Sequence, residues 1–328
     1  MITLFGVFVS TLLVITAIGM VRSQNLFGAV MLTGLFSLQM AVIFFILDAA
    51  DVALTEAAVG AGVATVLLLS ALALTSDEEA RRRRRRWVAM TVVSATTLMV
   101  IYATFDQPRL GDPEAPVHQH VAPWYLAETP RLIDVPNVVT AVLASFRGYD
   151  TLGELFVIFT AGIGVMFILA DGREKGRLSL LPSPDAQGLR HHLVPRVVGR
   201  LLVPFIVLFG LYVQFHADFG PGGGFQAGAL ISAGMILYAL LEGESAALRA
   251  VSFQALAGMI AGGAFLFVAV GVAGMMLGGH FLDYSVLSSD PVVGQHLGIF
   301  LVELGVGITV TGVLLTIFHA LSARVQRS

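Results

Sequence analysis

The sequence predicts an all-α integral membrane protein, a polytopic bundle of about nine transmembrane helices. Hydrophobic residues make up 56% of the 328 residues and charged residues only 12%, with a mean hydropathy of +0.85. A soluble core does not need that much apolar sequence. Apolar stretches of about 20 residues, the length that crosses a bilayer as a helix, recur along the chain. The weaker alternation of polar and apolar residues that is typical of a β-barrel is not seen.

The expected spans follow one another along most of the chain. They cover roughly residues 2–21, 26–47, 53–75, 87–105, 151–170, 199–217, 224–241, 252–276 and 293–320. The first span has no basic flank before it and no A-x-A cleavage pattern after it. We therefore expect it to be retained rather than removed as a signal peptide.

Six consecutive arginines, Arg81–Arg86, separate the third span from the fourth. Six guanidinium groups are too costly to move through hydrocarbon, so this loop should stay in the cytoplasm and contact anionic lipid. A nucleic-acid-binding tail would need these charges on a soluble chain, so we expect no nucleic-acid partner.

Nine spans place the two termini on opposite sides, with the N-terminus outside and the C-terminus in the cytoplasm. Of the 19 lysines and arginines, all except Arg109, Arg131 and Arg147 then lie inside, which is the asymmetry that the positive-inside rule describes. The expected location is the bacterial cell (inner) membrane, as a multi-pass protein.

We expect three membrane modules and one linker. Residues 1–80 form a three-helix module, and residues 81–175 form a second module with an outer loop at 106–150. Residues 176–198, which are polar and contain prolines, form a cytoplasmic linker. Residues 199–328 form a four-helix module.

The outer loop is expected to be irregular, because its six prolines forbid a long helix. Its apolar stretch 138–146 is too short to span a bilayer and should form an interfacial or re-entrant helix. His118 and His120 would need further ligands to hold a metal, so we interpret their surroundings as an ordinary solvated loop.

Several kinds of chemistry are excluded by missing residues. The chain has no cysteine, which excludes iron–sulfur clusters, haem attachment through C-x-x-C-H and disulfides. It has no G-x-x-x-x-G-K-[ST] run and no H-E-x-x-H. We therefore expect no cofactor, no metal site and no nucleotide hydrolysis by a P-loop.

Charged groups inside membrane helices each cost roughly 2.5 kcal/mol or more at mid-helix, so each needs a reason. The candidates for an ion path are Asp51, Glu56, Glu154, His216, Asp218 and Glu303. The expected topology places the acidic groups at the centre or in the outer half of the membrane. Carboxylates in a low-dielectric cleft attract cations, so this pattern predicts an acidic path open to the outside.

Some of these groups have structural alternatives. Glu154 follows Thr151 by three residues, which is the capping-box pattern. Asp51 could be an N-cap of the third span, but a cap would not explain Glu56, which is the firmer candidate. Glu303 lies about halfway along the last span, either as a neutral hydrogen-bonding group inside the bundle or as a proton or cation site.

Glycine positions indicate two close approaches of the backbone. Between the sixth and seventh spans, Gly222, Gly223 and Gly224 force an unusual backbone at membrane depth, which is tolerated only against protein or a water-filled cavity. The alternative is a tight turn between two helices. In the eighth span, Gly258 and Gly262 form a G-x-x-x-G pair that predicts close helix packing.

Four runs of residues resemble one family of membrane complexes. The run Asp51–Gly60 resembles the D-like module of Mrp-type multisubunit cation/proton antiporters and related membrane-bound hydrogenases, and Phe146–Glu154 resembles the adjoining E-like module. The runs His216–Gly228 and Asp290–Gly307 resemble the B-type component of the antiporter. The resemblance covers nearly the whole chain, in the order D-like, E-like, B.

This resemblance implies a non-catalytic subunit of a complex that exchanges monovalent cations, mainly Na⁺, for H⁺. It implies packing against the large proton-pumping-type components A and D and assembly with the small components C, E, F and G. It also implies that carboxylates matching Glu56 and Glu154 line the ion path. The cation itself is not specified, because Na⁺, K⁺, Li⁺ and H⁺ would all use carboxylates and backbone oxygens.

The sequence leaves three other functions open. The chain could be the membrane module of a redox-driven complex, such as a membrane-bound hydrogenase or a complex-I relative. A stand-alone secondary transporter would show two matching halves with broken helices, and the sequence has one marked break, at 220–224. In a purely structural scaffold, the acidic groups would only pair or cap.

Overall fold

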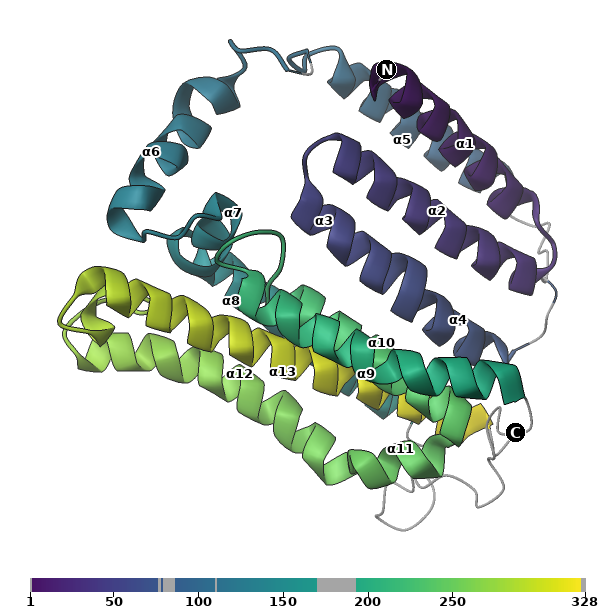
Figure 1. Cartoon of the computed structure of the whole chain (residues 1–328). Coiled ribbons are helices and arrows are strands. Elements are labelled where there is room, and N and C mark those ends of the chain that lie inside the picture. Colours follow the sequence, from purple (N-terminus) through teal and green to yellow (C-terminus); the bar gives the residue numbers. More distant parts are fainter. Residues whose placement is uncertain (1, 76–77, 79–85, 110, 170–192, 326–328) are drawn as a thin grey trace.

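The computed structural model describes residues 2–75, 78, 86–109, 111–169 and 193–325 (Figure 1). Within these ranges the regular elements are helices, apart from an isolated bridge between Asn25 and Glu78. Nine of the described helices are long and apolar enough to cross a membrane, which confirms the predicted fold class. The arginine loop and its expected lipid contact, and most of the linker 176–198, lie outside the described residues.

The elements are labelled in chain order. They are α1 (Ile2–Arg22), α2 (Leu26–Ile46), α3 (Ala50–Thr55), the π-helix η1 (Glu56–Ala64), α4 (Thr65–Leu72), α5 (Arg86–Thr104), the π-helix η3 (Val117–Val121), α6 (Ala122–Leu132), α7 (Val138–Thr140), the π-helix η4 (Ala141–Phe146), α8 (Gly148–Leu169), α9 (Leu193–His216), α10 (Gly224–Glu242), α11 (Glu244–Ala250), α12 (Phe253–Met276), the 3₁₀-helix η5 (Tyr284–Leu287) and α13 (Pro291–Val325).

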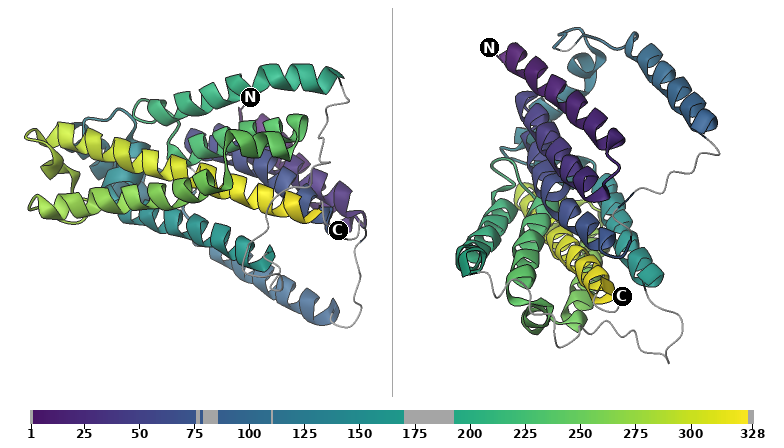
Figure 2. Two further views of the ribbon diagram at one scale, coloured as in Figure 1. Left: turned by 90° about the horizontal axis from the view of Figure 1, so that it is seen from below. Right: turned by 90° about the vertical axis from the view of Figure 1, so that its right-hand side faces the viewer.

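The last helix, α13, is the centre of the bundle. It packs against α8, α10 and α12, and most of its span is buried (Figures 1 and 2). One apolar core near its start includes Phe267, Tyr284 and Val302, and a second core near its end includes Leu256 and Phe318. Because α13 contacts elements from every part of the chain, it positions side chains that are far apart in sequence.

One span is almost unsupported by the rest of the chain. Helix α5 stands apart from the bundle (Figure 2), and each of its side chains from Trp87 to Thr104 is exposed. An apolar helix with this exposure must be covered by lipid or by another protein.

Two local expectations were wrong. The third span, expected as one helix, is α-helical at both ends but π-helical from Glu56 to Ala64. The outer loop, expected as irregular, contains the helical run 117–132. Pro123 lies in the first turn of α6, where its missing N–H costs nothing, and Pro130 lies near its end, so a short helix forms despite both prolines.

The stretch 138–146 is helical, as predicted, and it is buried on one side, whereas Val139 and Leu143 are exposed. Ala141 and Ala144 are completely buried in the core around α13. The small side chains allow this approach, so one side of the segment packs directly on protein. It brings Thr140 next to Ala217, in the turn between α9 and α10.

A cluster of polar side chains lies at the C-terminal end of α10. Glu242 pairs with Arg196, with Nε and Oε1 3.3 Å apart, and with Arg200. Glu244 contacts His319, with Oε1 and Nδ1 3.3 Å apart, and accepts a hydrogen bond of 2.8 Å from Ser322 Oγ. These pairs join α9, α10, α11 and α13 and compensate the charges that the fold buries there.

The predicted G-x-x-x-G contact is wrong by one residue. A Cβ at Gly258 or Gly262 would meet no described atom within 4 Å, outside the helix's own backbone and chain neighbours. The close contact is made by Gly263 instead, where a Cβ would lie 2.5 Å from the carbonyl oxygen of Gly305 and 2.9 Å from the amide nitrogen of Thr309. Residue 263 is rotated by about 100° from residue 262 around α12, which turns it towards α13.

We expect Gly263→Ala to destabilise the protein and Gly262→Ala to be neutral or slightly stabilising. The first substitution pushes a methyl group into the backbone of α13, and overpacking of this kind costs about 1–3 kcal/mol. The measurement is the thermal stability of each variant in detergent, with Gly262→Ala as the matched control. Equal stability of the two variants would contradict the contact between α12 and α13.

Candidate functional site

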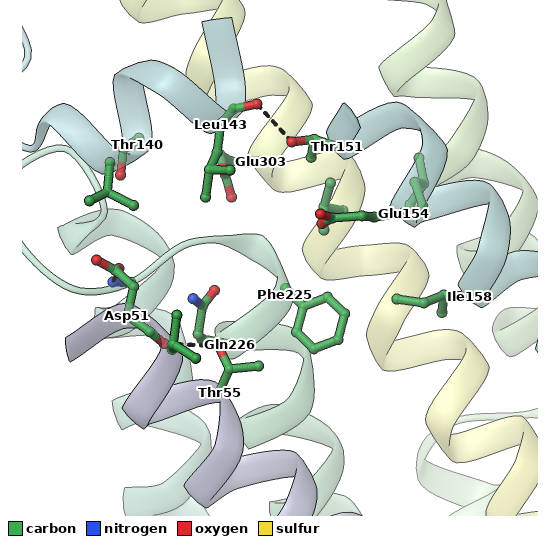
Figure 3. Close-up of a pocket in the computed structure, with 15 residues that line it drawn as sticks. Asp51, Thr55, Thr140, Leu143, Thr151, Glu154, Ile158, Phe225, Gln226 and Glu303 are labelled. Carbon is green, nitrogen blue, oxygen red and sulfur yellow. Dashed lines mark hydrogen bonds between the residues drawn. The ribbon is translucent and has the colours of Figure 1, made fainter. Parts of the chain in front are cut away.

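A cavity of about 320 Å³ opens where three distant parts of the chain meet (Figure 3). Its walls come from α3, from the region of α7, η4 and α8, and from the start of α10 with α13. The lining residues are Asp51, Val52, Thr55, Val139, Thr140, Leu143, Thr151, Glu154, Leu155, Ile158, Gly222, Phe225, Gln226, Glu303 and Val306. Three of the six predicted ion-path residues are among them: Asp51, Glu154 and Glu303.

Asp51 reaches the cavity from the first turn of α3. Its Oδ1 accepts a hydrogen bond of 2.9 Å from the backbone N–H of Gly222. The N-cap of α3 is Ala49, which makes no side-chain capping bond. The capping alternative for Asp51 is therefore wrong. Its carboxylate instead joins two segments that are 171 residues apart.

Glu303 reaches the cavity from the centre of the bundle. Its Oε2 accepts a hydrogen bond from the backbone N–H of Gly224, the first residue of α10. The N-terminus of a helix carries a partial positive charge and free N–H groups, so it is a favourable partner for a carboxylate. The side chain is thus held by the start of α10 while it lines the cavity.

The segment 217–224, which we call the glycine loop, contacts both carboxylates. Gly223 has φ of 131°, a conformation that side chains rarely adopt. A Cβ at Gly224 would overlap the carbonyl oxygen of Glu303 and lie 2.8 Å from the amide nitrogen of Gly307. The glycines therefore allow the loop to lie directly on α13, with two of its N–H groups directed at Asp51 and Glu303.

Glu154 lies in the second turn of α8, and Figure 3 shows its carboxylate pointing into the cavity. The helix begins at Gly148, and the hydroxyl of Thr151 donates to the carbonyl oxygen of Leu143 at 2.7 Å. Thr151 is therefore not an N-cap, and the capping-box alternative for Glu154 is wrong. Its neighbour Phe225 gives that side of the cavity an apolar wall.

His216 and Asp218 lie beside the cavity rather than on its wall, within the part of the chain described. The ring of His216 stacks on Tyr212, with centroids 4.8 Å apart. Burial raises the pKa of Asp218 above its ordinary value, and the nearby positive charge of His296 opposes that shift. Asp218 is itself part of the glycine loop.

Glu56 is not among the described residues that line the cavity, although it was the firmer sequence prediction. It begins the π-helical segment η1. A Cβ at Gly60 would lie 2.7 Å from Glu56 Oε1 and 2.8 Å from Ser37 Oγ, so these two groups face the same narrow gap between η1 and α2. π-Helical segments inside α-helices are frequent at functional sites. The π-helix that begins at Glu56 therefore makes this carboxylate a functional candidate even though it lies outside the cavity.

Sequence reasoning missed the polar groups that complete the site. Thr55, Thr140 and Gln226 add hydroxyl and amide groups to the cavity wall. Asn137 holds the glycine loop from outside. An Asn before the apolar run 138–146 indicates a helix N-cap, but nothing in the sequence indicates which distant segment it contacts.

Comparison with protein-family models gives three matches in chain order. Residues 11–77 match the MbhD family and residues 80–177 match the MbhE family, which describe the D and E components of MBH. Residues 194–316 match a domain related to the MnhB subunit of the Na⁺/H⁺ antiporter.

Two relatives match parts of the chain. One, from Rhizobium meliloti, is a probable A/B component of a K⁺/H⁺ antiporter, 27% identical over 37% of this chain and 14% of its own length. The other is a putative antiporter subunit, mnhB2, of Staphylococcus aureus, 34% identical over 40% of this chain and 94% of its own length. The chain thus spans only a small part of the first relative and nearly all of the second.

Two solved structures are similar. The first is the Mrp complex from Dietzia sp. DQ12-45-1b, with a TM-score of 0.75 and 29% identity, covering 96% of this chain and 34% of the matched chain. The second is the membrane-bound sulfane sulfur reductase, an archaeal respiratory membrane complex, with a TM-score of 0.53 and 25% identity over 71% of this chain and 97% of the matched one.

Proposed function

The chain belongs to the family of multisubunit cation/proton antiporter proteins related to MnhB, and from this premise we propose that it supplies part of the ion path of such an antiporter. It is a membrane subunit that works within a complex rather than alone. The exchanged ions are a monovalent cation and a proton.

One observation carries this proposal. Three carboxylates from three distant segments, those of Asp51, Glu154 and Glu303, converge on one cavity between helices long enough to cross a membrane. Three acidic groups around one cavity repel one another when all are ionised, and bound protons or cations reduce that repulsion. A cavity that must take up positive charge is suited to pass cations or protons.

The proposed partners are the other components of the antiporter, the large A and D and the small C, E, F and G. The similarity to one third of a chain of the Mrp complex supports assembly with larger proteins. The exposed helix α5 and the exposed sides of α1 and α9 offer apolar surface for such contacts. In this arrangement the chain contributes carboxylates, and the remaining steps of the path lie in its partners.

Reconstitution in proteoliposomes tests whether the chain works only within a complex. The complete complex should exchange Na⁺ or K⁺ for H⁺, whereas the isolated chain should give no cation-driven proton flux. Strong antiport by the isolated chain would overturn this proposal and favour a stand-alone transporter.

Glu154→Gln and Glu56→Gln should each reduce antiport by the assembled complex. Gln keeps the size and hydrogen bonding of Glu but cannot bind a proton or neutralise a cation. We expect the larger effect from Glu154→Gln, because this side chain lines the cavity. The measurement is cation-dependent proton flux divided by the amount of assembled complex. Unchanged flux in both variants would make the two groups structural.

We propose that the N-terminus is outside and the C-terminus is in the cytoplasm. Because the chain has no cysteine, single cysteines can report the topology directly. Asp112→Cys should react with an impermeant thiol reagent added to intact cells, and Glu78→Cys should react only after the membrane is opened. The reverse pattern would invert the topology and put the cavity at the cytoplasmic side.

The similarity to a respiratory complex supports a second candidate, a membrane module of a redox-driven ion pump. That assembly would carry its redox centres in other proteins. Iron bound to the purified complex, together with ion transport that depends on an electron donor, would favour this candidate. Antiport driven by ion gradients alone, in a complex without iron, would favour the antiporter.

A further inference from the structure

The glycine loop is held in place by hydrogen bonds from a segment outside it. Asn137 Nδ2 donates to the carbonyl oxygens of Ala217 at 2.9 Å and Gly220 at 2.8 Å. The backbone N–H of Asn137 donates to the carbonyl oxygen of Asp218 at 3.0 Å. The hydroxyl of Thr140 donates to Ala217 at 2.7 Å. These bonds tie the segment before η4 to a loop about 80 residues further along the chain.

The other side of the loop rests on α9. The N–H of Gly223 donates to the carbonyl oxygen of Val213 at 3.3 Å. A Cβ at Gly222 would lie 2.5 Å from the same oxygen, so the loop has no room to move in that direction. Between these two supports, its N–H groups meet the carboxylates of Asp51 and Glu303.

We propose that Asn137 is a positioning residue, whose side-chain amide sets the place of the glycine loop and thereby the distance between the loop N–H groups and the two carboxylates. Asn137 is not among the described residues that line the cavity, so it acts through the loop and through Thr140, whose hydroxyl accepts a hydrogen bond of 3.0 Å from Nδ2. This inference rests on the proposed function of the cavity. It predicts that the affinity of the site for its ion depends on the Asn137 amide.

Two roles of Asn137 can be separated by substitution. Its Oδ1 accepts a hydrogen bond from the N–H of Val139 at 3.1 Å, which is an N-cap. Ser also caps a helix well, but it is too short to reach the loop and has no N–H donors. Asn137→Ser therefore keeps the cap and removes the hydrogen bonds that Nδ2 donates to Ala217, Gly220 and the hydroxyl of Thr140. The bonds from the Asn137 backbone N–H and the Thr140 hydroxyl to the loop remain. Asn137→Asp keeps the size of the side chain and replaces the donors by an acceptor.

A matched control lies at the start of α2. Asn25 caps that helix through Oδ1, which accepts from the N–H of Gly28 at 2.9 Å. It is separated from the cavity by the full length of α2, so Asn25→Ser changes the same residue type in the same capping role. Comparing Asn137→Ser with Asn25→Ser isolates the contribution of the loop contacts.

The experiment uses the complete complex in proteoliposomes, with NaCl and KCl as separate probes at several pH values. Proton flux is divided by the amount of assembled complex, and the half-saturating cation concentration is measured. We expect Asn137→Ser to raise that concentration by roughly tenfold, because two neutral hydrogen bonds to the loop are lost. We expect Asn137→Asp to raise it at least as much, and Asn25→Ser to match wild type.

Two results would overturn the inference. One is a half-saturating concentration and pH profile like those of wild type in both Asn137 variants. The other is a loss of assembled complex with an unchanged concentration in what remains, which would make Asn137 a packing residue. Glu303→Gln, measured in the same experiment, separates failure of the positioning role of Asn137 from failure of the proposed function of the cavity. If it lowers antiport while the Asn137 variants do not, only the positioning role fails; if it also transports like wild type, the proposed function fails too.

Discussion

Glu303→Gln should strongly reduce antiport by the assembled complex, because it removes a carboxyl group that can bind a proton or neutralise a cation. The variant keeps the shape of the side chain, and its amide oxygen can still accept the hydrogen bond from Gly224. What it loses is the capacity to bind a proton or to neutralise a cation. We therefore expect normal assembly together with a strong loss of transport, or a shift of its pH optimum.

Glu128→Gln is the control for this prediction. Glu128 pairs with Arg131 on α6, away from the cavity, and Arg131 is largely exposed. Exposed ion pairs contribute about 0–1 kcal/mol, so this variant should assemble and transport normally. A scaffold role for Glu303 predicts the opposite pattern. In that case Glu303→Gln would transport like wild type at every pH, and Glu303→Leu would fail to assemble.

Gly224→Ala should strongly reduce the amount of assembled protein. The added Cβ would overlap the carbonyl oxygen of Glu303 and lie 2.9 Å from the Cβ of Val306. Backbone atoms of a buried helix cannot move aside as a flexible side chain does, so α10 would have to shift away from α13. Overpacking costs about 1–3 kcal/mol, and here the shift also breaks the hydrogen bond to Glu303.

The measurement for Gly224→Ala is the yield and thermal stability of the purified protein. Gly164→Ala is the control, since a Cβ at that position of α8 would meet no described atom within 4 Å beyond its own helix and chain neighbours. The control should be neutral or slightly stabilising, because Ala favours a helix over Gly by about 1 kcal/mol. Similar stability of the two variants would mean that the close contact of α10 with α13 is wrong.

The membrane spans could be predicted because they depend on hydrophobic length, which is a local property of the chain. The acidic candidates could be predicted for a related reason, since any charge within an apolar stretch is conspicuous. Asp51, Glu154 and Glu303 were found in this way, and the structure brings all three to one cavity. Their convergence could not be predicted, because it depends on contacts between segments that are far apart in sequence.

Local patterns failed where tertiary contacts decide the outcome. Thr151 and Glu154 have capping-box spacing, but α8 begins three residues earlier, so the hydroxyl bonds to Leu143 instead. Gly262 has G-x-x-x-G spacing, but the direction in which α12 faces α13 selects Gly263. In each case the pattern is compatible with several helix starts or rotations, and packing chooses among them.

The three-part wall of the cavity also has a consequence for how the site is assembled. Because all of its parts belong to one polypeptide, they are present in equal numbers and at an effective concentration on the order of millimolar or above. Contacts that would be too weak to hold separate proteins together at cellular concentrations are then sufficient. Loss of a contact such as that of Asn137 with the glycine loop should alter the affinity of the site, whereas the same loss between separate polypeptides would appear as dissociation on dilution.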